Sequence, residues 1–310
     1  MEEIRMKIVI LDGHTINPGD LSWDKVAQYA DELTVYEKTD PDQIQERIAG
    51  YDILMTSKCG ITRDIMANAP SLKYIGETAT GYNNIDIEAA REFGIAVANV
   101  PAYASDAVSQ HTIALMLEIA NNVGLNNASV QAGEWASSEY FCYWQKPIVL
   151  LAGRSLGIIG YGAIGKRVGE IASALGMQIN VYSRDPEAAI KSDFVTLHCP
   201  LTPENEKMVN EDFLNRMKPG AVLINTARGG LIDEDAVAKA LKDGRLSAAG
   251  IDVLTTEPPD ANCPLIGLGN CILTPHMAWA PVEMRQAVID TLADNLAAWL
   301  NNEKRNRLDI

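Results

Sequence analysis

The feature that constrains this chain most is a regular alternation of short β-branched runs with helical patterns. The first half holds the runs MKIVILD, ELTVYE, YDILMTS, LKYIGETA and IAVANV, with amphipathic segments such as DQIQERIAG between them. A second series follows: RSLGIIG, MQINVYS, DFVTLHC, AVLINTA, LSAAGID and CILTPH. Strand runs that alternate with helices are typical of βαβ units, in which helices cover a parallel sheet. The pattern therefore predicts an α/β protein.

The length and the break between the two series predict two domains. A chain of 310 residues is too long for one ordinary core. The stretch AVSQHTIALMLEIANNVG reads as one long buried helix that opens the second domain, with Ser105-Asp106 as its N-cap. The final segment PVEMRQAVIDTLADNLAAWLNN is helical and has no strand after it. We expect two Rossmann-like or flavodoxin-like domains with an active-site cleft between them: residues 1–98 plus 283–310, and an inserted domain of residues 99–282.

Composition excludes several classes of function. A net charge of -15 disfavours binding to nucleic acid or to an anionic membrane. No apolar run approaches the roughly 20 residues that span a bilayer. The first residues, MEEIRMKIVILDG, carry acids where a signal peptide needs basic residues, so we expect a cytoplasmic protein. Five scattered cysteines without a CxxC pair indicate neither a disulfide framework nor a metal site.

A glycine-rich turn supplies the first chemical signal. Gly160, Gly162 and Gly165, with Ala163 and Ile164 between them, follow the strand pattern LGIIG and precede a helix. In this context the first glycine makes a tight turn, the second lets backbone N–H groups approach a pyrophosphate, and the third allows close packing of helix on strand. The motif predicts a dinucleotide site, whereas a plain glycine turn is the alternative.

The end of the next strand bears on the choice of cofactor. An acid about 20 residues after the glycine turn binds the ribose diol of NAD. Here the sequence reads Ser183-Arg184-Asp185, so the expected acidic position holds serine. Serine and arginine can bind the 2′-phosphate of NADP, which a carboxylate would repel. We expect NADP or NAD and favour NADP; the alternative is that Asp185 reaches the diol after a small shift in register.

Three further segments lie where successive strands are expected to end. They are AVLINTARGG with Arg228, LSAAGIDVLTTEPP with Asp252 and Glu257, and CILTPHMAWAP with His276. Ligands of open α/β sheets bind at the carboxyl ends of the strands, so these side chains are expected to converge. Three other histidines compete with His276: His14 in a loop, His111 inside an apolar helix, where a packed or interface role is expected, and His198 in a strand-end turn near the cofactor path.

These segments resemble the signatures of the D-isomer-specific 2-hydroxyacid dehydrogenases. The resemblance rests on NTARGGLIDEDAV, GIDV…EP, TPHMAW and HCPLTPE, and it covers nearly the whole chain. The stretches LDGHTINPGDLSW, TATGYNNID and NVPAYASDAVSQHT are similar to the glycerate dehydrogenase or hydroxypyruvate reductase branch of that family. The resemblance implies that residues 1–98 plus 283–310 form the substrate-binding (catalytic) domain and that residues 99–282 form the dinucleotide-binding Rossmann domain.

By this resemblance, Arg228 binds the substrate carboxylate and polarises the keto oxygen, His276 is the general acid/base and Glu257 pairs with it. The chemistry fits, because a guanidinium fork clamps a carboxylate and a carboxylate-backed imidazole can protonate an oxygen that gains charge. The loop Ala79-Thr80-Gly81 offers N–H groups to the substrate carboxylate. Further implied cofactor contacts are Ala163, Ile164, Cys199, Pro200, Thr226, Ala227 and Asp252. Asp252 holds the nicotinamide end or, alternatively, caps a turn.

The sequence thus predicts an oxidoreductase that transfers hydride between NAD(P)H and a small 2-keto acid, with hydroxypyruvate or glyoxylate reduced to D-glycerate or glycolate. The alternatives are another D-2-hydroxyacid dehydrogenase, of D-lactate or phosphoglycerate type, and a nucleotide-sensing corepressor on the same fold. The glutamate beside the histidine disfavours relatives of formate dehydrogenase. We also expect a homodimer built by the long helix and the aromatic loop QAGEWASSEYFCYWQKP. Whether Trp135 or Trp144 reaches the partner's site stays open.

Overall fold

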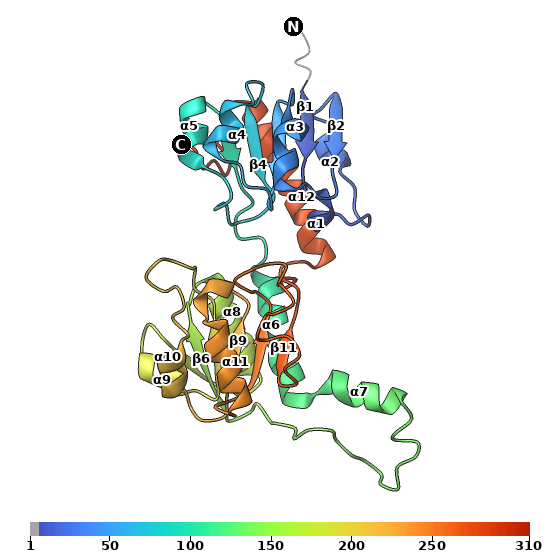
Figure 1. Cartoon of the computed structure of the whole chain (residues 1–310), viewed down its shortest axis with the longest axis vertical. Coiled ribbons are helices and arrows are strands. Elements are labelled where there is room, and N and C mark those ends of the chain that lie inside the picture. The colour runs from blue at the N-terminus through green and yellow to red at the C-terminus, as the bar shows by residue number, and fades with distance from the viewer. Residues whose placement is uncertain (1–5) are drawn as a thin grey trace. The chain divides into compact units, whose positions relative to one another are not determined.

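A computed structural model of the chain describes residues 6–310, so the acidic residues 2 and 3 used above lie outside the described part. The chain divides into two compact units (Figure 1): one extends up to Ala104 and resumes at Ala280, and the other runs from Ser105 to Trp279. The predicted boundaries at 98/99 and 282/283 are therefore a few residues off. Hydrogen bonds from Val100 N to Ala79 O (3.1 Å) and from Asn295 Nδ2 to Asn99 O (2.8 Å) hold residues 99–100 in the first unit.

The first unit has one parallel sheet whose strands follow the order β2-β1-β3-β4-β5, as in flavodoxin-like domains. Strands β3 and β4 are buried throughout, which explains their continuous apolar runs. The C-terminal helix α12 packs on the sheet, and the ring centroids of Tyr74 on β4 and Trp299 on α12 lie 5.1 Å apart. The described elements are β1 (Lys7–Ile10), α1 (Gly13–Ile16), α2 (Asp24–Ala27), β2 (Glu32–Val35), α3 (Ile44–Ile48), β3 (Ile53–Thr56), α4 (Arg63–Ala67), β4 (Tyr74–Glu77), α5 (Ile87–Phe93), β5 (Ala96–Ala98) and α12 (Val282–Leu300).

The second unit has a parallel sheet with the strand order β11-β10-β9-β8-β6-β7, flanked by helices. Each of its six strands coincides with a predicted run. The order reverses at β6, which lies between β7 and β8 and is followed by the glycine-rich turn. The elements are α6 (Ser105–Asn121), α7 (Val123–Gln131), β6 (Ser155–Ile159), α8 (Ala163–Ala174), β7 (Gln178–Val181), α9 (Pro186–Ile190), β8 (Phe194–Leu197), α10 (Glu211–Arg216), β9 (Ala221–Asn225), α11 (Glu234–Lys242), β10 (Leu246–Ile251) and β11 (Cys271–Leu273).

The segment after α6 departs from the prediction of one long helix followed by a loop. Asn122 adopts a left-handed backbone (φ 52°), which ends α6 at Asn121 and starts the separate helix α7. Helix α7 and residues 132–150 extend away from the rest of the unit (Figure 1). We call residues 123–150 the arm.

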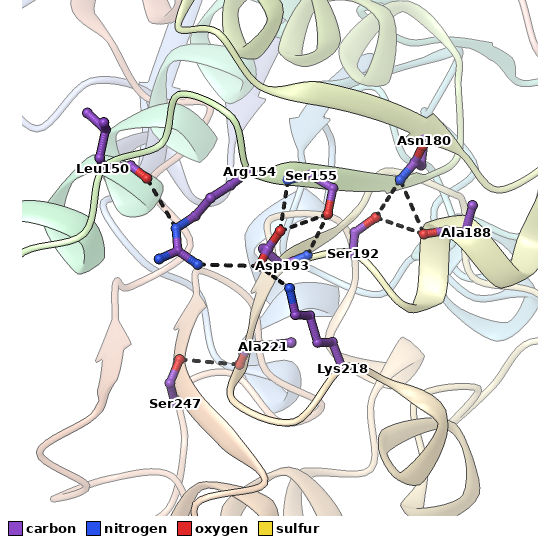
Figure 2. A network of polar contacts seen from close by, with 10 residues as sticks. All are labelled: Leu150, Arg154, Ser155, Asn180, Ala188, Ser192, Asp193, Lys218, Ala221 and Ser247. Atoms are coloured by element: carbon purple, nitrogen blue, oxygen red, sulfur yellow. Dashed lines mark hydrogen bonds and ion pairs between the residues drawn. The ribbon is translucent and has the colours of Figure 1, made fainter.

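A polar network closes the amino end of the second sheet (Figure 2). The carboxylate of Asp193, just before β8, accepts hydrogen bonds from Ser155 N (2.9 Å), Ser155 Oγ (2.9 Å), Lys218 Nζ (2.7 Å) and Arg154 Nη1 (3.3 Å). Burial alone would raise the pKa of Asp193, but the bonds from Lys218 and Ser155 outweigh it and lower the pKa to about 2. Ionic contacts thus fix this end of the sheet, whereas ligands of doubly wound sheets bind at the opposite, carboxyl end of the strands.

The first unit buries a pair of carboxyl groups at the carboxyl end of its own sheet. Asp12 accepts from Thr56 Oγ1 (2.9 Å), and Glu77 accepts from Asn84 Nδ2 (3.0 Å). Burial, with a smaller contribution from nearby Asp12, raises the pKa of Glu77 from its ordinary value of 4.5 to about 8. Glu77 is therefore protonated in the folded protein at neutral pH.

Replacing Glu77 with glutamine is expected to stabilise the protein increasingly as the pH rises. Between pH 4.5 and about 8 the folded chain keeps a proton that the unfolded chain releases, so wild-type stability falls across this window. Glutamine cannot release a proton, so this loss of stability is absent from the variant. We expect its free energy of unfolding to exceed that of wild type by about 2–4 kcal/mol at pH 8. Melting temperatures of both proteins between pH 5 and pH 8 measure it.

Exposed Glu46 on α3 provides the matched control, because Glu46→Gln is expected to show no growing advantage. A difference in melting temperature between Glu77→Gln and wild type that stays constant from pH 5 to pH 8 would contradict the expectation.

Candidate active site

The glycine-rich turn has the geometry of a pyrophosphate site. Gly160 has a left-handed backbone (φ 95°), and a Cβ there would lie 2.4 Å from Cys199 N. At Gly165 a Cβ would lie 2.1 Å from Gly160 O, whereas at Gly162 it would meet nothing within 4 Å. Helix α8 begins at Ala163 without a side-chain cap or an acid in its first turn. Its first N–H groups and the open approach at Gly162 suit an anion at the positive end of the helix.

The other predicted cofactor residues lie on loops at the same edge of the sheet. Cys199 and Pro200 follow β8, and the contact between Gly160 and Cys199 brings that loop against the glycine-rich turn. Thr226 and Ala227 follow β9, where the Thr226 hydroxyl lies 2.9 Å from that of Thr112 on α6. These positions lie after β8 and β9, beside the reversal in strand order between β8 and β6, which is the usual ligand crevice of doubly wound sheets.

The residues after β7 were expected either to bind a 2′-phosphate, through Ser183 and Arg184, or to bind a ribose diol, through Asp185. Ser183 and Arg184 are exposed, and the Arg184 guanidinium lies 5.3 Å from the centre of the Tyr161 ring. Asp185, by contrast, is the N-cap of α9 and accepts from Ala188 N (3.0 Å). Its carboxylate is already used as a helix cap, which weakens the alternative that it reaches a ribose diol.

His276 and Glu257 form a direct pair. His276 Nδ1 lies 2.5 Å from Glu257 Oε2, and Glu257 Oε1 accepts from Leu254 N (2.8 Å), which fixes the carboxylate on its own turn. Both side chains are about one-third exposed, at 34% and 32%. Since an ionised carboxylate only accepts, Nδ1 carries a proton and Nε2 is the ring nitrogen left to exchange one. The pair can deliver a proton to an oxygen that gains charge.

Arg228 lies on the neighbouring loop, after β9, with its side chain exposed to solvent and bonded through Nη1 to Ala227 O (2.7 Å). The next residue brings this loop against the one that follows β10, because a Cβ at Gly229 would lie 2.0 Å from the carbonyl carbon of Leu254. Arg228 and the Glu257–His276 pair therefore occupy three consecutive loops at the carboxyl edge of β9, β10 and β11. A guanidinium at this edge can clamp a planar carboxylate.

Asp252 is bound to the loop that carries His276. Its Oδ1 accepts from Thr274 Oγ1 (2.5 Å) and Met277 N (3.0 Å), and its Oδ2 accepts from Ala278 N (3.0 Å). Its own backbone carbonyl accepts from His276 N (2.8 Å). Of the two roles expected for Asp252, these contacts favour capping the turn over holding the cofactor. Thr274 was missed by the sequence analysis, although it stands two residues before His276 in ILTPH.

The rival histidines occupy different environments. Burial lowers the pKa of His198 to about 4, which keeps the ring neutral at neutral pH, and its Nε2 lies 3.0 Å from Thr196 Oγ1. His14 is exposed on α1 in the first unit. His111 is half-buried, with Nε2 3.0 Å from Thr274 Oγ1. Of the four, only His276 pairs with a glutamate among the described residues.

The predicted substrate loop of the first unit, Ala79-Thr80-Gly81, follows β4. Ala79 O accepts from Val100 N (3.1 Å), and Thr80 Oγ1 donates to Val100 O (2.7 Å). Within the described chain, the three N–H groups of this loop donate to no protein acceptor. Unpaired backbone N–H groups are available to donate hydrogen bonds to a carboxylate.

Comparisons with known proteins agree with this geometry. Residues 113–278 match the family described as D-isomer specific 2-hydroxyacid dehydrogenase, NAD binding domain. The chain belongs to this family. It is 41% identical to a hydroxypyruvate reductase of Blautia hydrogenotrophica, over 97% of this chain and 99% of that one. It is 39% identical to a glycerate dehydrogenase of Methylorubrum extorquens, over 97% and 98%.

A solved structure of an acyclic imino acid reductase in complex with NADPH and D-Arg shares the architecture of the dehydrogenase, with 31% identity and a TM-score of 0.82, over 98% of this chain and all of that one. The dehydrogenase is thus an oxidoreductase whose second unit includes a nicotinamide-dinucleotide-binding domain. In residues 6–310, no helix is long and apolar enough to cross a membrane. The same residues place no three His, Cys, Asp or Glu side chains together as metal ligands.

Proposed function

We propose that this dehydrogenase reduces a small 2-keto acid: hydroxypyruvate to D-glycerate, or glyoxylate to glycolate. The observation that carries the proposal is the 2.5 Å pair of His276 Nδ1 and Glu257 Oε2 beside the Arg228 loop. The similarity to a hydroxypyruvate reductase and a glycerate dehydrogenase over nearly the full chain supports the substrate class.

Each group of the site has its own role in the proposed reduction. The bound nicotinamide supplies the hydride. Arg228 holds the substrate carboxylate and polarises the keto oxygen, and His276 Nε2 protonates that oxygen as its charge grows. Glu257 keeps the imidazole oriented and fixes a proton on its Nδ1. We propose that the N–H groups of residues 79–81 also bind the substrate carboxylate.

We further propose NADP as the preferred cofactor. Ser183 and Arg184 are exposed at the end of β7, where a 2′-phosphate is expected, while Asp185 is engaged as the N-cap of α9. The NADPH held by the imino acid reductase of the same fold supports this choice. The residues proposed to hold the dinucleotide are Gly160, Gly162, Ala163, Ile164, Gly165, Ser183, Arg184, Cys199, Pro200, Thr226 and Ala227.

Initial rates test both proposals. The loss of absorbance of NADH and of NADPH is followed with hydroxypyruvate, glyoxylate, pyruvate and 3-phosphohydroxypyruvate. We expect the highest kcat/KM with hydroxypyruvate or glyoxylate, and a preference for NADPH that Arg184→Ala reduces. A highest kcat/KM with pyruvate or the phosphorylated acid would instead indicate another dehydrogenase of the family. Tight cofactor binding with negligible turnover would indicate a sensor.

We propose that the arm builds a homodimer. Phe141 is 92% exposed, Leu150 75% and Tyr140 74%, and the arm further exposes Val123, Trp135, Trp144 and Ile148. An apolar surface of this extent marks a protein interface. Trp135 donates through Nε1 to Phe141 O (3.0 Å) within the arm, so it has a structural role there. A cytoplasmic location is proposed as well, supported by five cysteines that are all free thiols.

The double variant Tyr140→Ser/Phe141→Ser is expected to shift the protein from dimer to monomer, since it removes two of the most exposed aromatic side chains of the arm. Sedimentation velocity over a concentration series measures the shift. The control is Ile266→Ser, which changes an exposed apolar residue of the same unit outside the arm. An unchanged dimer in the double variant, or a monomeric wild type, would contradict the arm as the interface.

A further inference from the structure

A chain of polar contacts links helix α6 to the loop that carries His276. His111 Nε2 lies 3.0 Å from Thr274 Oγ1, and Thr274 Oγ1 lies 2.5 Å from Asp252 Oδ1. His111 Nε2 is also 3.5 Å from Asp252 Oδ1. The side chain of Asp252 is almost fully buried and that of His111 largely so, with exposures of 1% and 18%. The mechanism proposed above uses neither His111 nor Thr274.

The positions of the protons in this chain follow from the donors and acceptors. Asp252 lacks a proton to give when ionised, so the Thr274 hydroxyl donates its proton to Asp252. Thr274 Oγ1 can then only accept from His111, which must carry its proton on Nε2. The order is His111 N–H to Thr274 O–H to the Asp252 carboxylate. Burial would raise the pKa of Asp252, but the bonds from His111, Thr274 and two backbone N–H groups outweigh it and lower that pKa.

The backbone of His276 shows what this chain of contacts holds in place. His276 adopts a left-handed conformation (φ 50°), which costs a non-glycine residue free energy and persists only where the surroundings enforce it. Three groups of Asp252 enforce it: the backbone O accepts from His276 N, Oδ1 from Met277 N and Oδ2 from Ala278 N. Both carboxylate oxygens must stay unprotonated and correctly oriented for these bonds to form.

We propose that His111 and Thr274 are positioning residues for His276, acting through Asp252 to hold the 276–278 loop in its strained conformation. The proposal rests on the role proposed for His276 but adds two residues whose side chains, among the described residues, form no hydrogen bond with Glu257, His276 or Arg228. Because α6 starts where the chain enters the second unit at Ser105, the contact also ties this helix to the loop from which the chain leaves that unit at Trp279.

Two matched pairs of variants test the proposal. Thr274→Val removes the hydroxyl at nearly constant volume, and Thr274→Ser restores it. His111→Leu removes the donor, and His111→Gln returns an N–H at the same reach. We expect kcat to fall about 10-fold to 100-fold in Thr274→Val and His111→Leu, with the KM for the cofactor little changed, and to recover in Thr274→Ser and His111→Gln.

The pH profile separates positioning from general damage to the structure. His111 is the titratable side chain that contacts Asp252, and loss of either donor raises the pKa of Asp252. The acid limb of kcat/KM should then move to higher pH in Thr274→Val, because a protonated Asp252 accepts the loop N–H groups poorly. A variant that is only less stable would lower activity without moving this limb.

Amide hydrogen exchange measures the order of the 276–278 loop directly, without relying on turnover. We expect the peptide that holds Met277 and Ala278 to exchange at least about tenfold faster in Thr274→Val than in Thr274→Ser. Equal exchange and equal kcat in these two folded variants would overturn the proposal. If wild type fails to reduce 2-keto acids while exchange still responds, the proposed function is wrong and the positioning of the loop stands. If Thr274→Val does not fold, the comparison of His111→Leu with His111→Gln decides.

Discussion

Replacing His276 with glutamine is expected to lower kcat for hydroxypyruvate by about 10²–10⁴-fold, the contribution of a positioned general acid. Glutamine is close in size and can still accept or donate a hydrogen bond, but it cannot hold the exchangeable proton that Nε2 carries while Glu257 occupies Nδ1. Steady-state kinetics at saturating cofactor measure the loss.

Cofactor binding by the same variant is the internal control for this expectation. His276 follows β11, whereas the glycine-rich turn follows β6. Fluorescence titration with NADPH should therefore give nearly the wild-type Kd. A variant that binds NADPH normally and keeps its turnover would exclude His276 as the proton donor, and a variant that loses NADPH binding would show that the change disrupted the domain.

Replacing Arg228 with glutamine is expected to lower kcat/KM by about 10²–10³-fold, because two charge-assisted hydrogen bonds to the substrate carboxylate are lost. Arg228→Lys keeps the positive charge but not the planar fork, so it should recover only part of this loss. If the guanidinium only binds the carboxylate, the fall in kcat/KM of Arg228→Gln should come mainly from a higher KM for the keto acid. If it also polarises the keto oxygen, kcat should fall as well.

The control for Arg228 is Arg216→Gln, which changes an exposed arginine of α10 that pairs with Glu187 and lies on the same unit. Its kinetics should match those of wild type. If Arg228→Lys is fully active, bidentate recognition is wrong and a single positive charge is sufficient. If Arg228→Gln is fully active, the substrate carboxylate is bound elsewhere.

The sequence predicted most of the fold because each βα unit carries its own local signal. The buried strands read as continuous apolar runs, and the glycine-rich turn of Gly160 and Gly165 requires a close approach that a side chain would block. The break between α6 and the arm was not predicted. It depends on a single residue, Asn122, which takes a left-handed conformation in an otherwise helical pattern.

For the site, the sequence predicted which loops carry the functional residues but not all the contacts that their side chains make. The strand ends placed Arg228, Glu257 and His276 at one edge of the sheet, and the pairing of His276 with Glu257 agrees with that. The use of Asp252 was left open, since a buried acid after a strand can serve a ligand or a loop, and only the tertiary structure places Thr274 and two N–H groups around it. The role of Asp185 as a helix cap depends likewise on the local backbone of α9.

The tight contact at Gly229 limits how this enzyme can be re-engineered. With a methyl group excluded there by the Leu254 carbonyl, the loop bearing Arg228 packs directly against the backbone of the loop bearing Glu257, so we expect a shift of one loop to displace the other. Attempts to admit bulkier keto acids by loosening either loop should therefore disturb the carboxylate clamp and the proton donor together. Libraries that aim at a broader substrate range would be better placed around residues 79–81, which belong to the other unit.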